Sequence, residues 1–281
     1  MAWSHTLLRN GTFWLDAGCM FGLTPRVVWT RWLEPDGKNR TELQQNALLL
    51  EGEGKLVVVE CGIGDKTGEK ERKIYTQQER AIHDSLREVN CDPKDIDAVI
   101  VTHLHFDHAG GLTRKGPDDK PVLTFPNAEI IVQRQEWDDA IANRSTMNKT
   151  YLREHLTPEV AERVRLIEGE AAVFEDHPDL RVFPTPGHTW GQQSVRFEDA
   201  KRRVRCFVAD VMPTHYHCKA TTNLAYDVEP YTSMLERTKL LDRAAAEGWA
   251  ILPNHEPNEN PWYGVVSYED KGSRAWALEP A

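Results

Sequence analysis

The 281-residue sequence contains no apolar run long enough to cross a lipid bilayer. Its longest uninterrupted apolar runs are strand-sized, as in Ala47–Leu50, Leu56–Val59 and Cys206–Ala209, whereas a membrane-spanning helix needs about 20 residues. The first residues also lack the basic segment and apolar stretch of a secretory signal. We therefore expect no membrane partner and a cytoplasmic location.

The sequence also has few cysteines and a deficit of positive charge. Its five cysteines are scattered and form no C-x-x-C pair, which argues against a disulfide framework or a thiolate zinc site. Lys and Arg number 34 against 44 Asp and Glu, a formal net charge of −10. Nonspecific nucleic-acid binding depends on Lys and Arg that displace phosphate counterions, so we expect no nucleic-acid partner.

No internal repeat, low-complexity tract or Ser/Pro-rich linker divides the chain. Apolar residues make up 40% of it and charged residues 28%, a composition typical of a soluble globular protein. We expect one continuous domain over residues 1–281.

The local patterns predict a mixed α/β chain of many short strands and a few helices. Ala47–Leu50 and Leu56–Glu60 form a predicted hairpin around Glu51-Gly52-Glu53-Gly54. Further predicted strands are Ala98–Thr102, Glu129–Gln133, Arg163–Ile167, Leu180–Phe183, Gln193–Phe197, Val204–Ala209 and Trp249–Leu252. Helices are predicted over Thr76–Asn90, Arg134–Ala142, Pro158–Glu162 and Tyr231–Glu247, with Thr157 as an N-cap and Gly248 as a helix stop.

A dense group of potential metal ligands follows one predicted strand. The run Thr102-His103-Leu104-His105-Phe106-Asp107-His108-Ala109-Gly110-Gly111 places three imidazoles and a carboxylate close together. On an extended segment His103 and His105 point the same way, while Asp107 and His108 reach a second point only if the chain bends. This arrangement fits two adjacent metal sites better than a solvated His-rich loop.

Three later segments repeat the pattern of a strand followed by a potential ligand. They are Thr185-Pro186-Gly187-His188-Thr189, Val208-Ala209-Asp210 and Leu252-Pro253-Asn254-His255-Glu256. Imidazoles and carboxylates are the usual ligands of Zn²⁺ and related divalent ions, and one carboxylate can bridge two ions. Alone, His188 or His255 would more often be an ordinary polar residue, but together these segments favour a metal centre.

The ordered set H-x-H-x-D-H, T-P-G-H-T, a strand-ending Asp and a strand-ending His resembles the metallo-β-lactamase superfamily. The resemblance implies a four-layer αββα sandwich with the site along one edge of its two sheets. It also implies that His103, His105 and His188 bind one metal ion, that Asp107, His108 and His255 bind a second, and that Asp210 bridges them. Zn²⁺ is the first expectation for both ions, with Mn, Fe and Co as alternatives.

Three further stretches resemble the quorum-quenching N-acyl homoserine lactonase branch of that superfamily. They are Asp16–Pro25, Cys61–Lys66, and Asp210–Thr214 taken with Ala225–Asp227. The chain departs from the family at Glu60, where a strand-ending Asp is usual, and this should change hydrogen bonding rather than metal binding. It also has Pro213 where lactonases of this type carry a tyrosine. A phenol that assists catalysis would then come from Tyr226 or Tyr216.

The function implied by the resemblance is a dinuclear metal-dependent hydrolase that opens lactone rings, first of all N-acyl homoserine lactones. A metal-bridging hydroxide would attack the carbonyl, and no covalent acyl-enzyme is needed. The expected catalytic residues are Asp107, which orients the nucleophile and moves its proton, Asp210 and Tyr226.

The segment from Met20 to Trp32 is apolar and aromatic, and we expect it to line an acyl-binding pocket. Met20, Phe21, Trp29 and Tyr226 are the predicted substrate contacts. A place in the core or in a homodimer contact explains the same segment about as well.

Other functions remain compatible with the same ligands. The centre could serve an aryl ester or phosphotriester hydrolase, a glyoxalase II-like thioesterase or an RNase Z-like nuclease. The C-terminal stretch 262–281 holds only Lys271 and Arg274 as cations, which disfavours a glutathione thioester, and the net charge disfavours RNA. A noncatalytic metal-binding protein is the alternative outside enzymes. The partner expected in every enzymatic case is a small molecule.

Overall fold

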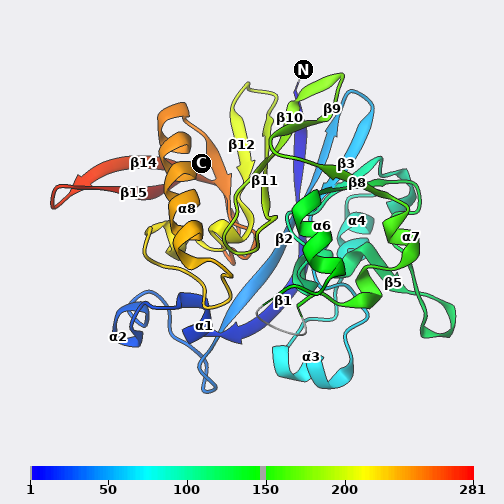
Figure 1. The fold of residues 1–281 in the computed structure, drawn as a ribbon, viewed down its shortest axis with the longest axis horizontal. Helices are drawn as coiled ribbons and strands as arrows, with labels where there is room; N and C mark the ends of the chain where they lie inside the picture. Colours follow the sequence, from blue (N-terminus) through cyan, green and yellow to red (C-terminus); the bar gives the residue numbers. More distant parts are fainter. Residues whose placement is uncertain (1, 146–149) are drawn as a thin grey trace.

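The structure is a computed structural model that describes residues 2–145 and 150–281. Most of the strands belong to two large sheets (Figure 1). None of the helices among the described residues is long and apolar enough to span a membrane.

The first sheet has six strands in the order β1-β2-β3-β4-β7-β8. These strands are β1 (Ser4–Asp16), β2 (Arg40–Gly52), β3 (Lys55–Val59), β4 (Ala98–Ile100), β7 (Glu129–Gln133) and β8 (Val164–Ile167). The strands from β1 to β3 pair antiparallel, and those from β3 to β8 pair parallel. The parallel strands therefore bring the loops that follow them to one edge of the sheet.

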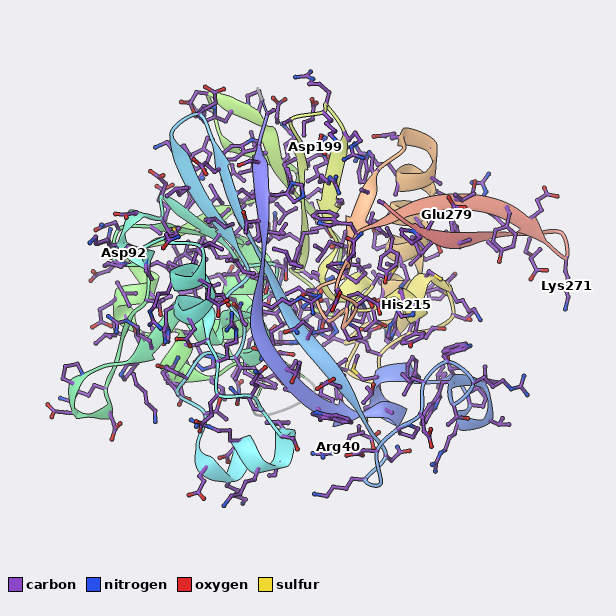
Figure 2. All side chains as sticks on the ribbon, turned by 180° about the vertical axis from the view of Figure 1, so that it is seen from behind. Arg40, Asp92, Asp199, His215, Lys271 and Glu279 are labelled. Atoms are coloured by element: carbon purple, nitrogen blue, oxygen red, sulfur yellow. The ribbon has the colours of Figure 1, made fainter. Side chains whose placement is uncertain are left out.

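The second sheet has seven strands in the order β15-β14-β13-β12-β11-β10-β9. These strands are β9 (Ala171–Phe174), β10 (His177–Pro184), β11 (Gln193–Glu198), β12 (Val204–Phe207), β13 (Ala250–Leu252), β14 (Tyr263–Asp270) and β15 (Ser273–Pro280). Strands β12 and β13 are parallel, so their C-terminal ends also meet at one edge. The hairpin of β14 and β15 extends away from the body, with Lys271 at its tip (Figure 2).

Helices cover the outer face of each sheet, which gives four layers. On the first sheet α4 (Ile82–Glu88), α6 (Arg134–Ile141) and α7 (Pro158–Ala161) contribute to one apolar cluster. On the second sheet α8 (Pro230–Glu247) buries Leu240 and Leu241. A third cluster fills the space between the sheets, with Leu48 and Ile100 from one and Val195 and Phe207 from the other. The predicted αββα sandwich is confirmed.

The remaining elements are short. They are α1 (Ala17–Phe21), α2 (Arg26–Trp29), α3 (Glu69–Tyr75), α5 (Phe106–Ala109), the strand pair β5 (Thr113–Lys115) and β6 (Pro121–Leu123), and the 3₁₀ turns η1 (Pro93–Asp95), η2 (Gly110–Leu112), η3 (Pro117–Asp119), η4 (Arg153–His155), η5 (Ala209–Val211) and η6 (His215–Cys218). Residues of α1 and α2 form an apolar lobe below the sheets with Phe13 and Leu43.

Several local predictions are confirmed. The hairpin of β2 and β3 turns at Glu53 and Gly54, both with positive φ. Helix α7 begins with the Thr157 hydroxyl accepting a bond from the Val160 amide. Helix α8 stops at Gly248, whose φ of 67° lies in the left-handed region that suits glycine. All five cysteines are free thiols.

Three differences from prediction have physical reasons. Strand β1 is not predicted from the sequence, because a bulge near Gly11, whose φ is 98°, interrupts the alternation of inward and outward side chains. The predicted helix over Thr76–Asn90 is α4 alone, since Thr76 adopts the left-handed conformation that ends α3. Helix α3 buries no residue and so has no apolar stripe to predict it.

Candidate metal centre

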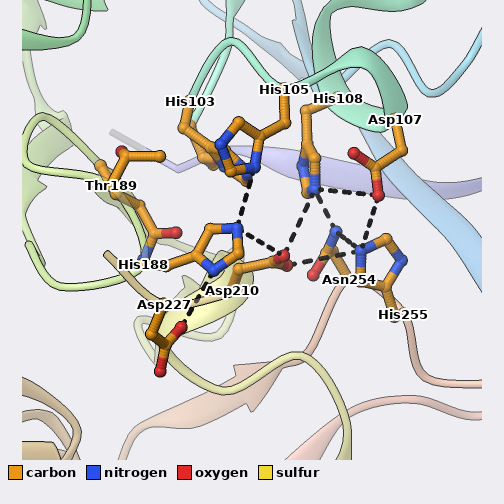
Figure 3. A network of polar contacts seen from close by, with 12 residues as sticks. His103, His105, Asp107, His108, His188, Thr189, Asp210, Asp227, Asn254 and His255 are labelled. Atoms are coloured by element: carbon orange, nitrogen blue, oxygen red, sulfur yellow. Dashed lines mark hydrogen bonds and ion pairs between the residues drawn. The ribbon is translucent and has the colours of Figure 1, made fainter. Parts of the chain in front are cut away.

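All seven predicted ligands follow strand ends at one edge of the two sheets. His103 and His105 follow β4, and Asp107 and His108 belong to the short helix α5 directly after them. His188 follows β10, Asp210 lies in η5 after β12, and His255 follows β13. The fold therefore gathers ligand segments that are up to 152 residues apart, from His103 to His255, into one cluster (Figure 3).

His103, His105 and His188 form the first group of converging side chains. His105 Nδ1 lies 3.1 Å from His103 Nε2 and 3.0 Å from His188 Nε2. His188 Nδ1 lies 3.0 Å from the Asp227 carboxylate, which can only accept, so Nδ1 carries the proton and Nε2 presents its lone pair. Three ring nitrogens that meet in this way match an imidazole metal site.

Asp107, His108 and His255 form the second group. His108 Nδ1 donates to Glu60 Oε2 at 2.8 Å, and His255 Nδ1 donates to the Gln44 carbonyl at 3.0 Å. The Nε2 atom of each ring therefore turns its lone pair inward when the ring is neutral. Those two nitrogens lie 3.9 and 3.6 Å from Asp107 Oδ2.

Asp210 lies between the two groups. Its Oδ2 is 3.3 Å from His188 Nε2 and 3.7 Å from His108 Nε2, and its Oδ1 is 3.4 Å from His255 Nε2. One carboxylate thus faces imidazoles of both groups, as a bridging ligand would.

The donor chemistry of the cluster fits divalent cations. Lone pairs of His188 and His255 point at carboxylate oxygens of Asp210, and such acceptor pairs attract each other only through a proton or a cation. Two buried atoms at the centre, His108 Nε2 and Asp210 Oδ1, have no hydrogen-bond partner within the described chain, although buried polar atoms are normally paired. A metal ion in each group would satisfy both.

The electrostatics of the cluster differ from one imidazole to the next. Burial and the neighbouring imidazoles hold the pKa of His103 well below its usual value, and burial with His188 does the same for His105. Burial also opposes protonation of His108, but the nearby carboxylates of Glu60, Asp210 and Asp107 outweigh it and raise the pKa of His108. Burial would raise the pKa of Asp210, but the surrounding imidazoles keep it far below its ordinary value. Burial opposes protonation of His188 too, but Asp210 and Asp227 outweigh it and raise the pKa of His188. His103 and His105 are therefore neutral ligands, whereas His108 and His188 lie where carboxylates attract positive charge.

Side chains behind the ligands fix their orientation. Glu60, which stands where the family usually has Asp, accepts the Thr102 amide at 2.7 Å and the His108 Nδ1–H at 2.8 Å. The Asp227 carboxylate holds His188 at Nδ1, and the Gln44 carbonyl holds His255 at Nδ1. Asp227 was visible in sequence only as part of the lactonase-like stretch Ala225–Asp227, and its contact with His188 had no sequence signal.

A cavity of about 430 Å³ opens onto the cluster. His105, Asp107, His188, Asp210 and His255 lie at its inner end. Its apolar and aromatic lining comes from Trp14, Leu15, Met20, Ile74, Tyr75, Phe106, Leu224 and Tyr226. The cavity joins the metal centre to a largely apolar chamber.

Of the four predicted substrate contacts, two line the cavity and two do not. Met20 and Tyr226 line the cavity, whereas Phe21 and Trp29 do not. Those two rings stack on each other at 5.5 Å and pack into the lobe, only 1% and 2% exposed. An apolar run alone does not show which of its side chains face the cavity. Phe21 and Trp29 occupy the core, which was the alternative to a substrate contact.

Of the two tyrosines expected from the sequence, Tyr226 lines the cavity that opens onto the centre and Tyr216 does not. Its phenol pairs with the Cys19 thiol, and burial together with that thiol raises the pKa of Tyr226. Tyr216 instead stacks on Trp32 in the lobe. Pro213 contributes its backbone carbonyl, which accepts the His255 amide at 2.9 Å.

The fold and the paired ligand groups define a metal-binding protein of the αββα class. Residues 40–215, more than half of the chain, match the family model of the metallo-beta-lactamase superfamily. The chain belongs to that superfamily.

Within the superfamily the chain is similar to N-acyl homoserine lactonases. It is 32% identical to one from a Bacillus species over 165 residues, and the match covers 58% of each chain. It is 28% identical to the lactonase AttM of Agrobacterium fabrum over 180 residues, or 62% of this chain and 64% of that one. The chain thus spans under two thirds of the length of these relatives.

A solved structure is similar over nearly the whole chain. It is a "probable metal-dependent hydrolase" from Staphylococcus aureus, 27% identical, with a TM-score of 0.84. The superposition covers 99% of this chain and 98% of that one. The common fold therefore extends well beyond the region matched by the family model.

Proposed function

We propose that this chain is a dinuclear metal-dependent hydrolase that opens lactone rings, with N-acyl homoserine lactones as the first substrate class. The observation that carries the proposal is the convergence of seven ligand side chains at the inner end of an apolar cavity. The relatives named N-acyl homoserine lactonase support the substrate class. The partner is then a small ester or lactone.

In this proposal each ligand group holds one divalent cation. The first cation is held by His103, His105 and His188. The second cation is held by Asp107, His108 and His255. Asp210 is shared. Such ions, when bound, lower the pKa of water and polarise a carbonyl oxygen. The mixture of imidazole and carboxylate ligands suits Zn²⁺, and also Mn, Fe or Co.

Asp107 is the residue that handles the proton. Its carboxylate side chain is 10% exposed and lines the cavity, so it reaches both the centre and a bound substrate. From there it accepts a hydrogen bond from the attacking water, orients it and takes its proton for delivery to the leaving alkoxide. The reaction then needs no nucleophilic Ser or Cys.

Tyr226 acts as a hydrogen-bond donor in the same proposal. Because its pKa is raised, the phenol keeps its proton at neutral pH and cannot serve as a base. Its place in the cavity lining lets it donate to an oxygen of the substrate and so orient the ring. Tyr226 would thus replace the tyrosine that lactonases of this type carry at the position of Pro213.

The apolar lining binds the acyl chain and excludes water from it. Each methylene buried against Leu15, Met20 or Leu224 should contribute about 0.8 kcal/mol. Catalytic efficiency should therefore rise with chain length until the cavity is full.

A hydrolysis screen tests the proposal directly. Metal-replete protein is assayed against acyl homoserine lactones of several chain lengths, simple lactones, an aryl ester, a phosphotriester and S-lactoylglutathione. The lactones should be the best substrates, and activity should vanish on chelation and return with added metal. If lactones are untouched while the aryl ester or the phosphotriester turns over efficiently, the lactonase proposal is wrong and another hydrolase activity takes its place. No metal-dependent turnover of any substrate would favour a noncatalytic metal-binding protein.

A further inference from the structure

A buried carboxylate on α6 lies behind the first ligand group. Glu136 is fully buried. Its Oε1 accepts the Leu104 amide at 2.8 Å and the Tyr151 hydroxyl at 3.2 Å, and its Oε2 accepts the Thr189 hydroxyl at 2.5 Å. No Lys or Arg pairs with it among the described residues, so these three donors are what stabilises the carboxylate.

Two of the three donors belong to the segments that supply the first group. Leu104 lies between His103 and His105, and Thr189 directly follows His188. The Tyr151 ring lies against the His105 imidazole, with ring centroids 5.3 Å apart. One carboxylate therefore joins two segments that are far apart in the sequence and that must stay in register for three ring nitrogens to meet.

The turn after His188 is built to approach α6 closely. A Cβ placed on Gly191 would lie 2.1 Å from the Glu136 amide nitrogen, well inside contact distance. Only glycine permits this approach, which brings the Thr189 hydroxyl onto the carboxylate.

The second group has no such contact with Glu136. Its own outer carboxylate is Glu60, which holds His108 and the Thr102 amide. A negative charge held behind the imidazoles of the first group favours a cation there, and the three hydrogen bonds fix the ligand geometry.

We infer that Glu136 is a positioning residue that sets the metal affinity of the His103, His105 and His188 group and leaves the other group unchanged. The inference rests on the proposed metal centre. Glu136 does not bind the metal itself, and it acts through a backbone amide, a hydroxyl and an aromatic ring.

The variant Glu136→Gln tests this inference with little change of volume. Its amide oxygen still accepts the Leu104 amide, but the charge is lost and an N–H₂ group faces a hydroxyl donor. Asp138→Asn is the matched control, since Asp138 is an exposed acid on the same helix. Thr189→Val removes a single donor and serves as the second test variant if Glu136→Gln fails to fold.

The experiment is a calorimetric titration of metal-free protein with Zn²⁺, repeated with Co²⁺ so that the visible spectrum reports the ligand geometry. Wild type and Asp138→Asn should bind two ions. Glu136→Gln should weaken one of the two binding steps by about 10- to 100-fold and alter only that ion's spectrum. Thr189→Val should weaken the same step to a smaller extent.

Ligand variants identify the affected step. In a His255→Ala background the remaining ion belongs to the first group, and Glu136→Gln should weaken its binding by the same factor. In a His188→Ala background Glu136→Gln should change little. If wild type binds two ions while Glu136→Gln weakens neither step, or both equally, the inference is wrong and the proposed centre stands. If wild type binds no ion, the proposed function fails and this inference with it.

Discussion

The two ligand groups of the centre lie side by side but differ in charge, since only the second contains a carboxylate of its own. The first group consists of three imidazoles that are at most 6% exposed, oriented by Asp227 and Glu136 from behind. The second contains Asp107, which faces the cavity, and is flanked by Glu60. The first group is thus suited to hold an ion rigidly, and the second to handle protons and substrate. Asp210 is the one ligand whose oxygens face both.

The largest effect is expected at this shared ligand. Asp210→Ala should lower kcat/KM by at least about 1,000-fold, or about 4 kcal/mol of transition-state stabilisation, because it lets the two groups separate. Steady-state kinetics on the best lactone measures the loss, with Asp138→Ala as the exposed control. Near-native turnover would show that Asp210 bridges nothing.

Single ligand variants should break one group and spare the other. His188→Ala and His255→Ala should each retain about one ion per chain, and activity should fall about 100-fold or more in both, since the reaction needs the two ions together. Elemental analysis after gel filtration measures the retained metal. Loss of both ions from either variant would mean that the groups are not separable.

The residues that orient the ligands should have intermediate effects. Asp227→Asn keeps one oxygen that can accept from His188 but removes the negative charge behind that ring. Glu60→Gln removes the charge behind His108 and leaves one acceptor oxygen for two N–H donors. Each should weaken the ion of its own group by about 10- to 100-fold. Competition with a chromophoric chelator gives the two affinities. Equal weakening by both variants at the same step would contradict the assignment of one outer carboxylate to each group.

The smallest effect concerns a buried histidine outside both groups. Burial, with the nearby Lys66 ammonium, lowers the pKa of His155 to about 3. The unfolded chain therefore binds a proton at this residue below its ordinary pKa of about 6.5, so stability is lost as the pH falls below that value. Between pH 7 and pH 5 the loss should be about 2 kcal/mol.

The variant His155→Leu should lack this part of the acid destabilisation. Chemical denaturation of wild type and variant at pH 7 and pH 5 gives the difference in slope. Equal pH dependence in the two proteins would show that His155 does not contribute. The pH dependence of stability that remains in His155→Leu then comes from the other titratable groups, the ligand histidines among them.

Short-range patterns in the sequence predicted single elements and the ligand cluster, whereas the four layers of the fold were implied by the resemblance to the metallo-β-lactamase superfamily. The apolar stripe of α8 and its stop at Gly248 are readable within one helix, and His103 to His108 lie within one loop. Strand β1 was missed because the Gly11 bulge breaks its alternation.

What the sequence could not show depends on contacts between distant segments. Glu136 occupies a position on an ordinary amphipathic helix, and its three donors come from three separate segments. Likewise the composition of the segment from Met20 to Trp32 does not tell that Met20 faces the cavity while Phe21 and Trp29 pack into the lobe.

The most direct test of the two-group account is the stoichiometry of metal binding. Metal-free protein titrated with Zn²⁺ should bind two ions per chain, and the Asp210→Ala variant should bind them less tightly. A reproducible limit of one ion per wild-type chain, unchanged by excess metal, would contradict the dinuclear centre.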